Sequence, residues 1–304
     1  MNCKYILIVS LTVMMFSGCF GPPRIITNPP MVKVHKNIVY AVDKKDKLKL
    51  DIYMPEHISK PSPALLWIHG GGWVRGSKRY SPIAPIATRG IVMVSVQYRL
   101  LSEETPWPTQ LHDLKAAVRF LRKNAKEYNI DPNRIGAWGV SAGGHLASML
   151  GVSQGIPELE GALGVTDASS EIQCVVAYCP PTNMTVLYES DVNWKMHYAI
   201  RSLLNGKPKD NPKLATAVNP ATYASNDDAP HIFIHGDQDP IVPVNQSTLL
   251  SDALIEQGVE AEVHILEDQP HGNIVIKSKA GRDEVHAFLQ KHLGAGAVPG
   301  PAGI

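Results

Sequence analysis

The chain has 304 residues, of which 44% are hydrophobic, and this is enough for one large α/β domain with a full core. Its 29 basic and 28 acidic residues give a net charge of +1. No long run of lysine or arginine occurs, which argues against a nucleic-acid partner. No Gly/Ser-rich linker or charge run divides the chain, so we predict a single domain over residues 32–293.

The first residues have the pattern of an export signal. Lys4 precedes an apolar run, Tyr5–Phe16, that is shorter than the roughly 20 residues needed to span a bilayer. The tetrapeptide Phe16–Cys19 resembles the lipobox of bacterial lipoproteins, in which the cysteine becomes the lipidated N-terminus. We expect a signal peptide over residues 1–19 with Cys19 lipidated. Ordinary secretion and an uncleaved anchor are the alternatives.

Residues 20–31 contain four prolines and are expected to form a tether between this anchor and the domain. The protein would then lie in the periplasm or on the outer surface of a bacterium. Its membrane contact would be limited to the lipid anchor.

The apolar runs of the domain predict a mostly parallel sheet. The first two, Val32–Val42 and Leu48–Met54, are both rich in β-forming residues, and polar and apolar residues alternate along the second. Together they favour an antiparallel edge. The later runs are continuous and are separated by helical segments, which is typical of a parallel sheet covered on both faces. These runs are Ala64–His69, Ile91–Val96, Arg134–Gly139, Cys174–Tyr178, His231–His235 and Ala261–Leu266.

Helices are expected between these strands. The clearest covers Pro108–Tyr128, with a turn at Asp131–Asn133 after it. Others should follow Ser141 and cover Asn245–Gln257 and Ala280–His292. We expect residues 184–217, which lack a strand signal, to form a small insertion over the C-terminal edge of the sheet, and residues 294–304 to be a flexible tail.

Two cysteines remain after the export segment, Cys174 and Cys179. Both fall in the stretch Ile172–Pro180, which predicts a buried strand. At about 3.3 Å per residue their Cα atoms would be about 16 Å apart, beyond disulfide reach. Without a second pair they do not form a zinc motif, and we interpret them as small core residues.

The stretch Gly139–Ala147, GVSAGGHLA, contains the pattern G-x-S-x-G between a predicted strand and a predicted helix. A sharp turn there forces the serine into a strained conformation that glycine neighbours tolerate. The turn exposes the hydroxyl of Ser141 and aims the N-terminus of the next helix at it. The pattern predicts a nucleophile; an ordinary glycine-rich turn is the alternative.

A serine nucleophile needs a base, and His271 is the best placed of the histidines, directly after the predicted last strand. His286 and His292 fall in the final helix, and His264 falls inside a strand. His145 lies in the nucleophile helix itself, where a packed, hydrogen-bonded histidine is expected.

The base in turn needs a carboxylate, and the stretch HGDQDPIVP, His235–Pro243, offers Asp237 and Asp239 at the end of a strand. Asp237 could cap the turn, whereas Asp239 lies further out, before a proline. Position alone favours Asp239 without excluding Asp237.

The stretch HGGGW, His69–Trp73, ends the first parallel strand and supplies candidate oxyanion donors. The N–H groups of Gly71 and Gly72 can face an oxyanion together with that of Ala142. The segment Gly71–Lys78 also approaches a phosphate-binding loop, but its Gly-Ser-Lys order misplaces the lysine.

Together these stretches, with Tyr98–Leu100 and Pro106–Pro108, resemble an α/β-hydrolase of the esterase/lipase type. Within that group the chain resembles bacterial feruloyl-esterase-like and acetyl-xylan-esterase-like carbohydrate esterases over residues 32–293. The resemblance implies that Asp239 is the triad acid, that Arg99 and Asp113 are framework residues, and that no cofactor or metal is used. Five aromatic residues could line an acyl or sugar pocket, with core packing as the alternative for each: Trp73, Tyr80, Trp107, Tyr188 and Trp194.

The resulting hypothesis is a serine carboxylic ester hydrolase with a small-molecule or polysaccharide ester as substrate. Activity should fall at acid pH as His271 is protonated. The alternatives are a general short-chain carboxylesterase, an arylformamidase-like amide hydrolase or another serine hydrolase such as a peptidase or lipase. A catalytically silent binding protein on the same scaffold is the alternative outside enzymes.

Overall fold

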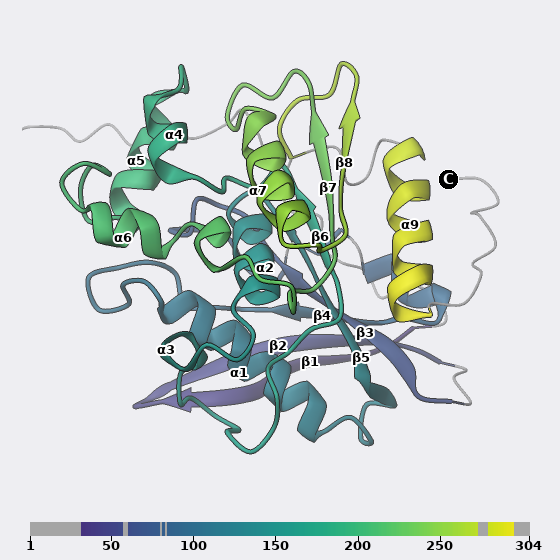
Figure 1. Cartoon of the computed structure of the whole chain (residues 1–304). Coiled ribbons are helices and arrows are strands. Elements are labelled where there is room, and N and C mark those ends of the chain that lie inside the picture. The colour runs from purple at the N-terminus through teal and green to yellow at the C-terminus, as the bar shows by residue number, and fades with distance from the viewer. Residues whose placement is uncertain (1–31, 57–59, 80, 83, 273–278, 295–304) are drawn as a thin grey trace, which may run out of the picture.

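The part of the chain described by the computed structural model comprises residues 32–56, 60–79, 81–82, 84–272 and 279–294. Figure 1 shows a twisted sheet with helices on both faces. The predictions for residues 1–31, for Tyr80 and for residues 295–304 lie outside the described residues. No helix in the described ranges is both long and apolar enough to cross a membrane.

The sheet has eight strands in the order β1-β2-β4-β3-β5-β6-β7-β8. Strand β2 runs antiparallel to β1 and β4, and the other neighbours are parallel. The predicted antiparallel edge and parallel sheet are thus confirmed. The strands are β1 (Val32–Asp43), β2 (Asp46–Pro55), β3 (Ser62–Ile68), β4 (Val92–Val96), β5 (Ile130–Val140), β6 (Val175–Tyr178), β7 (His231–Gly236) and β8 (Ala261–Leu266).

Two hydrophobic layers cover the sheet, because side chains of each strand alternate between its faces. In β3, Leu66 and Ile68 pack on the face covered by α1, α2 and α7, while Leu65 and Trp67 pack on the face covered by η1 and α9. The helices are η1 (Ala84–Arg89), α1 (Thr109–Lys123), α2 (Ala142–Val152), α3 (Pro157–Glu160), α4 (Met184–Glu189), α5 (Trp194–Leu203), α6 (Pro212–Ala217), η2 (Pro220–Tyr223), α7 (Asn245–Glu256) and α9 (Lys279–Leu293).

Two local predictions were wrong. The helix predicted to reach Tyr128 ends at Lys123: the Asn124 N–H makes the last helical bond, to the Phe120 carbonyl at 3.0 Å, and the chain then continues in turns, with the Asn124 carbonyl accepting from Glu127 three residues on. The predicted turn at Asp131–Asn133 lies inside β5. It still has a turn-like hydrogen bond, from the Asn133 N–H to the Asp131 carboxylate at 3.0 Å, at the point where β5 shifts its register against β3.

The insertion at residues 184–217 is helical and comprises α4, α5 and α6. Asn183 and Asn193 cap α4 and α5, since each side chain accepts two backbone N–H bonds of the first turn. A Cβ built at Gly72 would lie 3.2 Å from the Cβ of Ala199, so α5 packs against the HGGGW loop at the C-terminal edge of the sheet. This is the position predicted for the insertion.

Candidate active site

Ser141 lies at a sharp turn between β5 and α2. Its backbone has φ of 56° and ψ of −125°, a conformation that is costly for a residue with a side chain. The backbone is held there by hydrogen bonds on both sides: the Ser141 N–H donates to the Tyr178 carbonyl at 2.8 Å, and the Ser141 carbonyl accepts from His145 at 3.0 Å. The G-x-S-x-G pattern therefore forms the strained turn predicted from the sequence.

The two flanking glycines are required by close backbone contacts. A Cβ at Gly139 would lie 2.0 Å from the carbonyl oxygen of Gly143, and a Cβ at Gly143 would lie 2.1 Å from that of Ile68. No side chain fits at either position without a backbone shift. Packing thus explains why glycine occupies both positions.

His271 follows β8 and faces the serine. Its Nε2 lies 2.9 Å from the Ser141 Oγ, and its Nδ1 lies 2.7 Å from Oδ2 of Asp239. With Nδ1 protonated toward the carboxylate, Nε2 is free to accept the serine proton. Burial of the ring favours a lower pKa for His271, but the neighbouring Cys179 sulfur and the Asp239 carboxylate outweigh it, and the net pKa is raised above the ordinary value.

Asp239 is fixed by four contacts. Its Oδ1 accepts the N–H groups of Ile241 at 2.8 Å and Val242 at 2.9 Å, and its Oδ2 accepts from His271. The Nε2 atom of His235 lies 3.4 Å from the same Oδ2. Although burial raises the pKa of the carboxyl, these hydrogen bonds lower it well below the ordinary value, so Asp239 is ionised.

Asp237, the competing candidate, is exposed and lies outside this arrangement. The sequence did not reveal the contribution of His235, whose side chain is fully buried. Its Nδ1 contacts the Ser247 hydroxyl at 2.8 Å and its Nε2 donates to the Val242 carbonyl at 2.8 Å. The available signal was the spacing of four residues between His235, near the end of β7, and Asp239 in the loop that follows.

The loops carrying Asp239 and His271 approach each other through Gly236. A Cβ there would lie 2.0 Å from the carbonyl oxygen of Gln269, and the Gln238 N–H donates to that same oxygen at 3.2 Å. This contact places the two loops side by side at the ends of β7 and β8, so that the acid and the base can meet.

The HGGGW loop lies directly against the Ser141 turn. A Cβ at Gly70 would lie 2.8 Å from the Val140 carbonyl oxygen and 3.3 Å from the Ser141 Cβ. Gly71 and Gly72 both have positive φ, 124° and 61°. Gly70 thus touches the serine turn, Gly71 and Gly72 follow it in the loop, and Ala142 is the first residue of α2.

Trp73 links this loop to the nucleophile helix. Its indole N–H donates to Nδ1 of His145 at 3.2 Å, and Nε2 of His145 donates to the Val218 carbonyl at 2.7 Å. Burial lowers the pKa of His145 to about 4. His145 is therefore a neutral, packed histidine, as expected.

The four aromatic pocket candidates in the described part of the chain do not form one cluster around Ser141. Trp73 is fully buried, Trp107 is 9% exposed and packs 5.8 Å from the His145 ring, and both belong to the core. Tyr188 and Trp194 line a groove of about 680 Å³ on the insertion, where Trp194 is 67% exposed. Tyr80 is outside the described residues.

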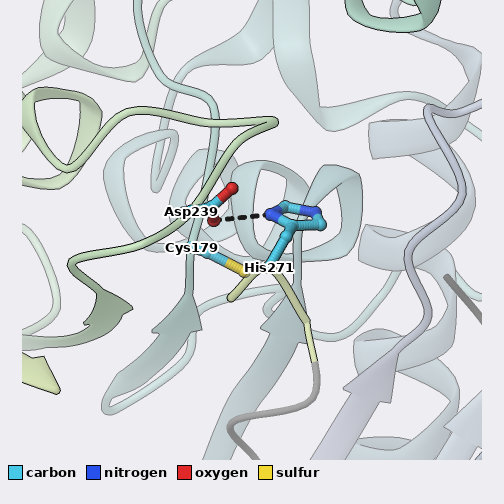
Figure 2. Close-up of side chains that lie close together, drawn as sticks. All are labelled: Cys179, Asp239 and His271. Atoms are coloured by element: carbon cyan, nitrogen blue, oxygen red, sulfur yellow. Dashed lines mark hydrogen bonds and ion pairs between the residues drawn. The ribbon is translucent and has the colours of Figure 1, made fainter. Parts of the chain in front are cut away.

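Cys179 was interpreted from the sequence as a small core residue within a strand; its burial in the core is confirmed, and its place in the strand is corrected. Strand β6 ends at Tyr178, and Cys179 has φ of 39°, which turns the chain out of the strand. Both Cys174 and Cys179 are free and buried, but only Cys179 lies beside His271 and Asp239 (Figure 2). The signal was its position at a strand end, the edge where the site residues gather.

The sheet and the arrangement of Ser141, His271 and Asp239 define a protein of the α/β-hydrolase fold. The model of the BD-FAE family matches residues 50–254, and the chain belongs to this family. The predicted resemblance to feruloyl-esterase-like and acetyl-xylan-esterase-like carbohydrate esterases is confirmed at the level of family and fold.

Three proteins that are similar to this chain are named as esterases or hydrolases. The esterase LipQ of Mycobacterium tuberculosis is 30% identical over 230 residues, which are 73% of this chain and 53% of LipQ. A truncated carbohydrate esterase from gut microbiota has a TM-score of 0.78 and 29% identity, covering 86% of this chain and 96% of that one. An acetyl ester-xyloside bifunctional hydrolase of Caldicellulosiruptor lactoaceticus has a TM-score of 0.73 and 25% identity, covering 86% and 97%. The chain spans about half the length of the curated relatives it matches.

Proposed function

We propose that this protein is a serine carboxylic ester hydrolase with Ser141, His271 and Asp239 as its triad. The observation that carries the proposal is the continuous chain of contacts from the Ser141 hydroxyl through His271 to Asp239, at 2.9 Å and 2.7 Å. These distances lie within hydrogen-bond reach of a nucleophile, a base and an orienting carboxylate. The names of its relatives, which are esterases, support the same activity.

In the proposed mechanism, His271 removes the hydroxyl proton while the Ser141 oxygen attacks the ester carbonyl carbon. Asp239 holds the ring in the required tautomer and stabilises the imidazolium. The C–O bond to the alcohol then breaks, and His271 gives its proton to the leaving oxygen. A water molecule, deprotonated by the same histidine, attacks the acyl-enzyme and releases the acid.

The oxyanion of each tetrahedral intermediate would be held by the N–H groups of Gly71, Gly72 and Ala142. Positive φ at both glycines and the start of α2 at Ala142 support this assignment. Removal of one such donor typically costs about 2.7 to 4 kcal/mol of transition-state stabilisation.

For the substrate, we propose an acetyl or feruloyl ester of a plant polysaccharide or a related carbohydrate. The carbohydrate esterase and the acetyl ester-xyloside hydrolase among the similar structures support this class. The exposed aromatic groove of the insertion supplies stacking surfaces of the kind that sugar rings use.

The experiment measures acid release from acetylated xylan and from feruloylated arabinoxylan, with Ser141→Ala as the blank. Release of acetate or ferulate by the wild type, absent from the blank, is the expected result. Cleavage of p-nitrophenyl acetate alone would leave a general short-chain esterase and remove the polysaccharide substrate. Hydrolysis of formylated aromatic amines in preference to esters would replace the reaction with amide hydrolysis.

For location, we propose that the protein is exported and anchored through a lipid on Cys19. The lipobox-like tetrapeptide Phe16–Cys19 supports this. Labelled palmitate should enter the wild-type protein in a bacterial host and should not enter Cys19→Ser. Equal labelling of both proteins, or of neither, would reject the anchor.

A further inference from the structure

The side of His271 that faces away from Ser141 carries a thiol in addition to the carboxylate. Ligand atoms of Cys179, Asp239 and His271 all lie within 4.8 Å of one another. Figure 2 shows the sulfur and the carboxylate on the side of the imidazole that carries Nδ1, while the other ring nitrogen points away from both. The esterase mechanism uses Asp239 and His271 but gives no role to the thiol.

We propose that Cys179, Asp239 and His271 form an inhibitory binding site for a thiophilic divalent cation of the Zn²⁺ type. One thiolate, one carboxylate oxygen and one imidazole nitrogen are a donor set that such ions prefer over Mg²⁺ or Ca²⁺. The thiolate and the carboxylate also carry two negative charges, which match the charge of the ion.

The distances suit such a site after a small adjustment. In a tetrahedral zinc site with bonds of about 2.0 to 2.3 Å, ligand atoms lie about 3.3 to 3.8 Å apart. The separation of 2.7 Å between Nδ1 and Oδ2 must therefore widen slightly, while the sulfur already lies within 4.8 Å of both atoms. The imidazole is 9% exposed, whereas the Asp239 side chain and Cys179 are fully buried, so an ion and a water as its fourth ligand would enter past the ring.

Inhibition follows from the tautomer of His271. An ion on Nδ1 takes the place of the proton that is shared with Asp239, and the neutral ring then carries its proton on Nε2. The nitrogen that faces the Ser141 hydroxyl at 2.9 Å would then be a donor and could not accept the serine proton. Binding releases one proton from the pair formed by the Cys179 sulfur and the His271 ring, and it leaves the ring neutral.

The first test rests on the proposed esterase activity. Initial rates on p-nitrophenyl acetate are measured against ZnCl₂ for the wild type, Cys179→Ala, Cys179→Ser and Cys174→Ala, each relative to its own metal-free rate. Cys174 is a matched control because it is equally buried and lies on the same segment, away from the site. Background hydrolysis by the ion is subtracted with Ser141→Ala.

We expect zinc to inhibit the wild type and Cys174→Ala alike, and EDTA to restore both. The Cys179 variants should need at least about 10-fold more zinc for half inhibition. Equal concentrations of MgCl₂ or CaCl₂ should leave the wild type active. Equal zinc sensitivity in the wild type and the Cys179 variants, or inhibition by Mg²⁺ as strong as by zinc, would overturn the proposal.

A second measurement needs neither activity nor a Cys179 variant. CoCl₂ is added to wild-type protein and to Ser141→Ala, and the near-ultraviolet absorption of a thiolate-to-cobalt charge transfer is recorded. The band should appear at one ion per chain in both proteins and be removed by zinc. Its absence rejects the metal site. If the band appears but the wild-type protein cleaves no ester, the site stands and the proposed function fails.

Discussion

The cradle of Ser141 and the helical insertion lie at the same edge of the sheet but are built by different means. The cradle, by which we mean the turn Gly139–Gly143 and the HGGGW loop beside it, has closely packed backbones. A Cβ added at Gly139 or at Gly143 would lie only 2.0 or 2.1 Å from a backbone carbonyl oxygen. The insertion α4–α6 is held by asparagine caps and one buried stripe, and it leaves Trp194 and Tyr198 67% and 61% exposed. The difference shows that close backbone packing fixes the turn at Ser141, whereas the insertion presents exposed aromatic side chains to solvent.

The largest effect is expected within the cradle, at the triad acid. Asp239→Asn should lower kcat/KM for p-nitrophenyl acetate by roughly 10⁴-fold, because the amide no longer holds His271 in the tautomer that accepts a proton. Asp237→Asn, two residues away and exposed, is the matched control and should change the rate by less than about 3-fold. A larger loss at Asp237 would reassign the acid.

The close packing of the cradle can be tested at a glycine. Gly143→Ala should cost more than about 4 kcal/mol in the free energy of unfolding or prevent folding, because the added Cβ would lie 2.1 Å from the Ile68 carbonyl oxygen. Gly155→Ala separates packing from conformation, since Gly155 has φ of 69° and nothing within 4 Å. It should cost only about 1 to 2 kcal/mol by chemical denaturation. Similar costs for the two variants would contradict the packing argument.

The pH dependence of turnover should report the raised pKa of His271. The unprotonated ring is the active form, so kcat/KM should rise with pH through an apparent pKa above 6.5, the ordinary value. In Cys179→Ala the midpoint should shift down, because one of the groups that raise this pKa is gone. A wild-type midpoint at or below 6.5, or an upward shift in the variant, would be inconsistent with the electrostatics described here.

The smallest effect on stability is expected on the insertion. Trp194→Ala should change the free energy of unfolding by less than about 0.5 kcal/mol, since the side chain is 67% exposed. Turnover of p-nitrophenyl acetate should be unchanged, whereas KM for acetylated xylan should rise about 3-fold or more. Trp73→Ala in the core should instead cost about 3 to 5 kcal/mol. If Trp194→Ala left the KM for acetylated xylan unchanged, the groove on the insertion would have no role in binding this substrate.

The sequence predicted the features that depend on local backbone geometry. The strained turn at Ser141 requires glycines at fixed spacing, and the parallel strands require continuous apolar runs, so both could be recognised without coordinates. The end of α1 was missed because residues 124–129, which form turns, contain no glycine or proline that would mark the end of a helix.

The neighbours of His271 were harder to predict because they come from three strand ends. Cys174 and Cys179 belong to one apolar stretch and looked equivalent, but the positive φ of Cys179 turns it out of β6 toward the site. The choice between Asp237 and Asp239 likewise depends on which carboxylate receives the N–H groups of the following residues. Position in the stretch HGDQDPIVP already favoured Asp239, whereas no pattern of residue types separates Cys179 from Cys174.

The central claim, that His271 activates Ser141 as a nucleophile, is tested most directly by covalent labelling. Wild-type protein, Ser141→Ala and His271→Ala are treated with a fluorophosphonate, and the adducts are located by peptide mass spectrometry. We predict one adduct per wild-type chain, on Ser141, none on Ser141→Ala, and labelling slowed by orders of magnitude in His271→Ala. An unlabelled Ser141 in folded wild-type protein, or labelling that is equally fast without His271, would contradict the account.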